Sequence, residues 1–123
     1  NNQRIGCFYN TRNLKQYIFQ INENGEYELV PYCRIDSPSD ISAFCFERCG
    51  KTYVTVWHKS GEAKLKLKLS AESIVYEDSL GGEKLPVESI DGTAVISVSN
   101  KRYLSTTLGK ETVLAAFEKA ELI

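Results

Sequence analysis

The sequence predicts an all-β chain: an antiparallel β-sandwich of about nine short strands with one helix near the C-terminus. Turn residues interrupt apolar, β-branched and aromatic runs about every 8 to 12 positions. No strands alternate with helices, as a nucleotide-binding parallel sheet would require. A length of 123 residues is typical of one domain, so residues 1–123 are expected to form a single sandwich.

The first three expected strands cover residues 4–9, 15–21 and 26–30, which are rich in aromatic and β-branched residues. Asn24-Gly25 separates the last two runs and predicts a tight hairpin, because both residues tolerate a positive φ. Pro31 closes the third strand, since proline has no N–H for a ladder.

The next two strands follow the polar loop 36–40. Residues 41–46 and 52–57 carry apolar side chains at both odd and even positions, so that both faces of each strand are apolar. Arg48-Cys49-Gly50-Lys51 predicts the turn between them. Runs that are apolar on both faces are typical of central strands covered on each side. Ser60-Gly61 predicts another reversal of the chain.

Residues 64–69 form the clearest strand. Strict alternation places Leu65, Leu67 and Leu69 on the core face and three lysines in water. Such lysines also protect an exposed sheet edge from pairing with another chain.

Four further strands are expected at residues 73–76, 84–87, 93–98 and 102–105, with Asp91-Gly92 as a second strong hairpin turn.

The final element is a helix near 110–122. It is expected to begin after Gly109 and to place Glu111 near the positive end of its dipole. Its apolar stripe favours packing within the molecule. That stripe consists of Val113, Leu114, Phe117 and Ala120.

Composition excludes several classes of partner. Fifteen basic and sixteen acidic residues leave a net charge of −1, so no basic field favours a nucleic acid. No stretch approaches the ~20 apolar residues of a membrane span.

The chain contains no methionine and starts at Asn1. It is therefore expected to be a piece of a longer precursor or a mature secreted chain. A secreted or periplasmic location is favoured, although no signal peptide is visible.

The four cysteines are Cys7, Cys33, Cys45 and Cys49. Zinc sites usually pair close ligands twice, and only the last two lie close together, so no metal and no cofactor are expected. Buried thiols are the favoured interpretation, and one disulfide is an alternative if the chain is exported.

No set of catalytic residues is predicted. His58 is the only imidazole, it follows Trp57 at a strand end, and no G-x-S-x-G motif accompanies it. Carboxylates near strand ends, Glu47, Glu77 and Asp78, have no neighbours that would clearly desolvate them. The chain is therefore not expected to be an enzyme by itself, and His58 is expected to be a hydrogen-bonded strand-end residue.

Aromatic residues are the remaining candidates, because sugar-binding proteins present flat rings to solvent. Tyr27, Tyr53 and Tyr103 belong to this group, but aromatic side chains also fill sandwich cores, which is the favoured interpretation of Trp57. The ligand-binding candidates are Tyr32, Trp57, His58 and Tyr76.

Residues 41–104 resemble the small C-terminal β-sandwich domain that follows the catalytic barrel in many glycoside hydrolases. The resemblance rests on ISAFCFERCGKTYVTVWHKSGEAKLKLKL, on SIVYEDSLGGEKLPV and on TAVISVSNKRYL. In that family an aromatic strand, a glycine turn and a strand ending in Trp-His precede a leucine strand, and Tyr-Leu closes the last strand. The first 40 residues and the terminal helix lie outside the pattern.

The resemblance implies a non-catalytic domain that packs on a catalytic domain of the same parent chain. The catalytic carboxylates of such enzymes belong to the barrel, so none is assigned here. Two alternatives stay open: a carbohydrate-binding module that holds a polysaccharide or oligosaccharide on exposed rings, and an adhesion or immunoglobulin-like domain. The latter lacks a cysteine after Trp57.

Overall fold

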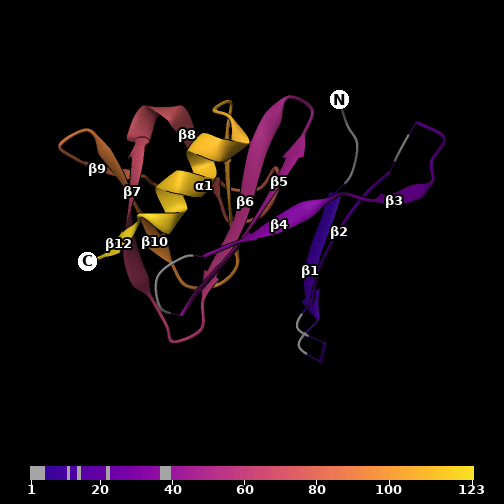
Figure 1. The fold of residues 1–123 in the computed structure, drawn as a ribbon, viewed down its shortest axis with the longest axis horizontal. Coiled ribbons are helices and arrows are strands. Elements are labelled where there is room, and N and C mark those ends of the chain that lie inside the picture. The colour runs from indigo at the N-terminus through magenta and orange to yellow at the C-terminus, as the bar shows by residue number, and fades with distance from the viewer. Residues whose placement is uncertain (1–4, 11, 14, 22, 37–39) are drawn as a thin grey trace. The chain divides into compact units, whose positions relative to one another are not determined.

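The computed structural model describes residues 5–10, 12–13, 15–21, 23–36 and 40–123. Arg4 of the first expected strand and residues 37–39 of the expected loop lie outside the described residues. The chain divides into two compact units, residues 1–32 and 33–123 (Figure 1). That residues 1–123 form a single domain stays a prediction.

The unit of residues 1–32 is a three-stranded antiparallel sheet in the order β1-β2-β3. The expected hairpin joins β2 to β3, but its loop is wider than a two-residue turn, because the last pair is Ile21 with Tyr27. Gly25 supplies the positive φ of 79° in that loop. The strands are β1 (Ile5–Asn10), β2 (Lys15–Ile21) and β3 (Tyr27–Leu29).

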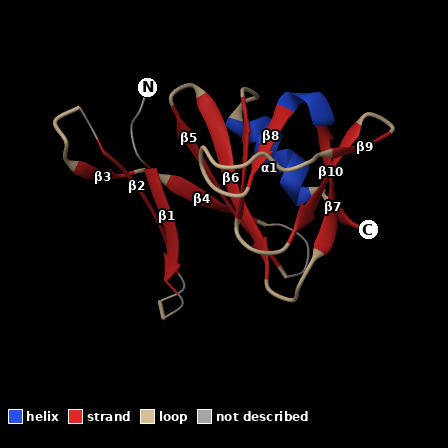
Figure 2. Cartoon of the chain, turned by 180° about the vertical axis from the view of Figure 1, so that it is seen from behind, coloured by secondary structure: helices blue, strands red, loops and turns tan. Residues whose placement is uncertain are grey.

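The unit of residues 33–123 contains two antiparallel sheets, with orders β4-β5-β6-β11-β8 and β12-β7-β10-β9. Strands occupy most of the chain in Figure 2. The strands of the five-stranded sheet are β4 (Tyr32–Ile35), β5 (Ile41–Arg48), β6 (Lys51–His58), β8 (Ile74–Glu77) and β11 (Arg102–Thr106). Those of the four-stranded sheet are β7 (Ala63–Ser70), β9 (Glu88–Ile90), β10 (Thr93–Val98) and β12 (Glu121–Leu122), with a short 3₁₀ turn, η1 (Ala71–Ser73), after β7.

The expectation of a β-rich chain with antiparallel sheets and one α-helix is confirmed for the described residues. Side chains from both sheets and from α1 (Lys110–Glu118) form one hydrophobic core in the 33–123 unit. Its fully buried members include Val54, Val56, Leu65, Leu67, Ile96 and Phe117.

β7 behaves as its alternation predicts. Leu65, Leu67 and Leu69 are buried in the core, whereas Lys64 and Lys68 are exposed. The expected edge position is wrong, since β7 lies between β12 and β10. Residues 121–122 pair with β7, and the N–H of Ile123 donates to the Lys64 carbonyl at 3.0 Å.

Two tight turns follow the predicted chemistry. Cys49-Gly50, with φ of 52° and 76°, connects Arg48 to its partner Lys51. Asp91-Gly92, with φ of 53° and 80°, connects Ile90 to Thr93. Positive φ at both central positions matches the right-handed twist of the strands.

The strand expected at 84–87 is wrong. Lys84 forms one isolated bridge with Glu77, and the N–H of Leu85 donates to the Tyr76 carbonyl at 2.8 Å. Pro86 has no N–H with which to continue the ladder. The partner of β10 is instead β9, which begins at Glu88.

The helix is shorter than the expected 110–122. It begins after Gly109, which is its N-cap, and ends at Glu118, where the Ala120 N–H donates to the Phe117 carbonyl at 3.2 Å. Residues 121–122 leave the helix because β7 offers them ladder hydrogen bonds. The expected stripe is confirmed at Val113, Phe117 and Ala120, which are buried in the core.

Replacing Phe117, which is fully buried, should test the helix–sheet core. Phe117→Ala is expected to lower the free energy of unfolding by about 3–5 kcal/mol, through lost burial and an unfilled cavity. Leu122→Ala, at a side chain with 40% exposure, is the control and should cost about 1 kcal/mol or less. Urea unfolding measures both, and equal losses would contradict this description of the core.

The Asp91-Gly92 turn gives a second test. Gly92→Ala should lower the free energy of unfolding by about 1–2 kcal/mol, because alanine resists a φ of 80°. An added Cβ meets no atom within 4 Å there, so the cost is conformational. Gly6→Ala, at an equally open position without a positive φ, should be neutral or slightly stabilising. A neutral Gly92→Ala in thermal unfolding would rule out this turn geometry.

Candidate functional site

Trp57 lies near the end of β6, with its ring on the face opposite the core, because Val54 and Val56 occupy the core face. The ring is half-buried and stacks on Phe44, with ring centroids 5.7 Å apart and an interplanar angle of 19°. The Lys101 ammonium lies 5.4 Å from the ring centroid, within cation–π range. Trp57 is thus held by two neighbours.

His58 ends β6 and is hydrogen-bonded, as predicted. Its backbone N–H donates to the Ser99 carbonyl at 2.9 Å, and its Nδ1 lies 2.7 Å from the Gly61 carbonyl oxygen. Because a carbonyl only accepts, Nδ1 must carry the proton of this bond, which leaves Nε2 as the acceptor of the neutral ring. The hydrogen bond from the imidazole to the Gly61 carbonyl stabilises the turn that follows β6.

Tyr76 is a core residue. Its ring is only 2% exposed, and its hydroxyl donates to the Ser97 carbonyl at 2.7 Å. Burial raises the pKa of this phenol well above its ordinary value. The ring therefore offers no surface to a ligand, unlike the sequence-based expectation.

Tyr32 is 38% exposed and opens β4. The other three candidates do not gather in one site: adjacent residues Trp57 and His58 point to opposite faces of β6, and Tyr76 points into the core.

An aromatic layer occupies the outer face of the five-stranded sheet. It consists of Phe44, Phe46, Tyr53 and Trp57, at positions that alternate with core residues of β5 and β6. Phe46 and Tyr53 are cross-strand partners whose rings stack at 5.2 Å and 7°. Both faces of this hairpin are therefore apolar, as its sequence predicts.

The aromatic layer continues across the sheet. Tyr103 of β11 pairs with Thr55, and Val75 of β8 lies beside Ser105 on the same face. Val75 is 39% exposed, and Tyr103 is half-buried. The outer face thus carries apolar side chains from Trp57 to Val75 at the β8 edge, with the polar Thr55 and Ser105 among them.

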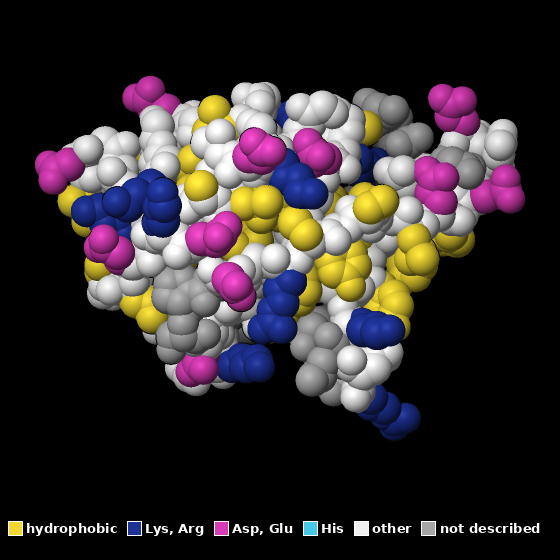
Figure 3. Space-filling view, viewed as in Figure 1, with side chains coloured by type: hydrophobic (Ala, Val, Ile, Leu, Met, Phe, Trp, Pro, Cys, Tyr) yellow, Lys and Arg dark blue, Asp and Glu magenta, His cyan; other side chains and the backbone are white. Residues whose placement is uncertain are grey.

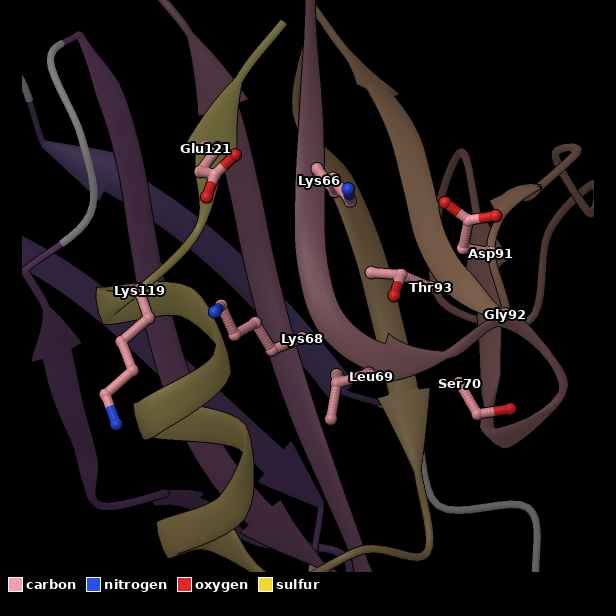
Figure 4. Close-up of a pocket in the computed structure, with 9 residues that line it drawn as sticks. All are labelled: Lys66, Lys68, Leu69, Ser70, Asp91, Gly92, Thr93, Lys119 and Glu121. Carbon is pink, nitrogen blue, oxygen red and sulfur yellow. The ribbon is translucent and has the colours of Figure 1, made fainter.

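A separate polar groove of about 420 Å³ lies on the four-stranded sheet (Figure 4). Its side chains come from β7, β10, β12, the β9–β10 turn and the residue after α1. A register shift between the two strands shapes it, since β10 advances from Thr93 to Val95 while β7 runs from Ser70 back to Lys66. The charged lining residues are Lys66, Lys68, Lys119, Asp91 and Glu121.

The groove has little capacity for chemistry. Its three ammonium groups and two carboxylates nearly balance, and exposed charges interact weakly in water. The Ser70 hydroxyl accepts from the Glu72 N–H at 3.3 Å, which caps η1 rather than poising a nucleophile. Basic and acidic side chains are also interspersed over the face in Figure 3.

The carboxylates considered from the sequence do not form a pair of an acid and a nucleophile. Asp78 caps its own turn, where Oδ1 accepts from the Glu83 N–H at 2.9 Å. Glu47 is exposed near the β5–β6 turn, far along the sheet from Glu77. Among the described residues no group of three His, Cys, Asp or Glu side chains could hold a metal ion, and no helix is both long and apolar enough to cross a membrane.

Comparison with known proteins gives no relative. No protein-family model matches the chain, and neither a curated protein nor a solved structure matches it significantly.

One pair of residues escaped the sequence reasoning. Cys33 on β4 and Cys45 on β5 belong to neighbouring strands and pack on the same core, where Cys33 helps to raise the pKa of the Cys45 thiol. The strand β4 was not expected, so nothing in the spacing of the cysteines brought these two together. The alternation of YCRI, which puts Cys33 and Ile35 on one face, was the signal from which this strand could have been predicted.

The buried phenol generates a prediction. Tyr76→Phe should lower the free energy of unfolding by about 1–2 kcal/mol, because the Ser97 carbonyl loses its donor. Tyr27→Phe, at a ring that is 76% exposed, is the control and should change stability by less than about 0.5 kcal/mol.

The same variant has a pH signature. Above pH ~10 the unfolded chain ionises this tyrosine while the folded chain keeps the proton, so the wild type loses stability. The stability difference between wild type and Tyr76→Phe should therefore shrink above pH ~10 and stay constant below it. A constant difference throughout would contradict the raised pKa.

Proposed function

We propose that the 33–123 unit is a β-sandwich that serves as a non-catalytic accessory domain of a glycoside hydrolase, packing on a separate catalytic barrel. The single observation that carries the proposal is the apolar outer face of the five-stranded sheet, formed by the aromatic layer and Val75. A sheet that is apolar on both faces needs a cover on both. The core covers one face. On the other, Phe44 and Phe46 are already buried, so the surface left for an inter-domain contact consists of the half-buried rings of Tyr53, Trp57 and Tyr103 and the exposed Val75.

The resemblance of residues 41–104 supports the same proposal. The aromatic strand, glycine turn and Trp-His strand of that pattern correspond to β5, the Cys49-Gly50 turn and β6. The leucine strand corresponds to β7, and Tyr103-Leu104 lies in β11. These segments share one core, as expected of one sandwich.

An association measurement tests the proposal. The chain 1–123, mixed with the separately produced catalytic barrel of its parent protein, should form a complex, since inter-domain contacts bury about 600–1,500 Å². Val75→Glu should weaken the complex at least about tenfold, because it places a charge in the proposed contact.

Ile90→Glu is the matched control. Ile90 is 40% exposed, close to Val75, and lies in a strand of the four-stranded sheet. Association should therefore be unchanged by this substitution. No complex at about 100 µM, or equal weakening by both substitutions, would refute the proposed contact.

A carbohydrate-binding module is the second candidate, because Tyr53, Trp57 and Tyr103 are half-buried rings on the same face. Against it, Phe44 and Lys101 lie over the Trp57 ring that a sugar would need. Trp57 is the sole tryptophan of the chain, so its fluorescence reports directly on this surface.

Titration with neutral and acidic oligosaccharides distinguishes the two candidates. The accessory-domain proposal expects no saturable change in Trp57 fluorescence up to about 1 mM sugar, an affinity worth only about 4 kcal/mol. Saturable quenching below that concentration, lost in Tyr53→Ala, would favour the binding module instead. Tyr27→Ala, at an exposed ring in β3, controls for nonspecific effects.

A further inference from the structure

Cys33 and Cys45 are placed for a covalent bond. They lie on β4 and β5, which are neighbours in the five-stranded sheet, and both side chains face the core. Cys45 is fully buried there, and Cys33 is half-buried against the same core. The two thiols are close enough for Cys33 to help raise the pKa of Cys45.

The spacing of paired strands suits a disulfide. Neighbouring strands lie about 4.7–4.9 Å apart, and disulfides span Cα atoms roughly 4.4–6.8 Å apart, so cysteines on the same face of adjacent strands can be bridged. The third cysteine that the structure describes, Cys49, is exposed in the β5–β6 turn. Nothing holds a second thiol against it among the described residues.

We propose that Cys33 and Cys45 form a disulfide that cross-links β4 to β5 when the chain meets a small-molecule disulfide such as oxidised glutathione. The half-exposed Cys33 reacts first: its thiolate attacks one glutathione sulfur, forms a mixed disulfide and releases one glutathione thiolate. Cys45 then loses its proton, attacks the Cys33 sulfur and expels the second glutathione. Two protein thiols are oxidised, and one glutathione disulfide is reduced to two glutathione thiols.

The second step sets the rate. Burial raises the pKa of Cys45 to about 12, and the neighbouring Cys33 adds to the effect. Because the thiolate is the nucleophile, ring closure should accelerate about tenfold for each pH unit between pH 7 and 9.

The test uses the full chain carrying Cys7→Ser and Cys49→Ser, so that only the proposed pair remains. Incubation with oxidised glutathione at pH 8, followed by intact mass spectrometry, should show a loss of about 2 Da and no retained glutathione. Both thiols should then resist alkylation in denaturant until a reductant is added. Adding Cys45→Ser should stop the reaction at a single mixed disulfide on Cys33.

Other results would overturn the proposal. These are two thiols that persist, a mixed disulfide that remains at the end of the reaction with Cys45 present, or oxidation that lowers the melting temperature. Peptide mapping of the oxidised wild-type chain is a second measurement that does not depend on the serine variants. It should recover a Cys33–Cys45 cross-linked peptide, and a bond to Cys49 instead would refute the assignment. The outcome does not depend on the proposed accessory role.

Discussion

The β5–β6 hairpin imposes the constraint on which the 33–123 unit depends: it is apolar on both faces, so both faces must be covered. On one face, Val54 and Val56 are covered by the four-stranded sheet and by α1. On the other, aromatic rings stack across the two strands, and Phe44 and Phe46 are buried. The tight Cys49-Gly50 turn fixes the register that puts each set on its face, and a slip of one residue would exchange them.

Sequence patterns within single segments were sufficient to predict much of this fold. Alternation identified the buried face of β7, turn chemistry located Asp91-Gly92, and 3.6-residue spacing placed Val113 and Phe117 in the core. The errors concern residues whose state depends on distant partners. Residues 121–122 read as helix until β7 is available to pair with them, and residues 88–90 become a strand only beside β10. Single-segment patterns carry no information on such pairing.

The same distinction applies to the candidate site. The hydrogen-bonded end of β6 could be expected from His58, which follows Trp57 immediately before a turn. The burial of Tyr76 could not, because its hydroxyl is satisfied by a carbonyl on β10 in the other sheet. The polar groove requires a register shift between β7 and β10, and the proximity of Cys33 to Cys45 requires β4. Each of these depends on elements that are remote in sequence.

The position of β12 has a consequence for the order in which the four-stranded sheet assembles. β7 is covered on one side by residues that follow it only after β8, β9, β10, β11 and α1. Contacts between such distant segments form late, because a long loop must close first. Until then β7 is an open edge during folding. Its alternating lysines, which belong to an interior strand of the finished sheet, then disfavour pairing of this edge with a neighbouring chain. Their charge would therefore protect the nascent chain more than the native molecule.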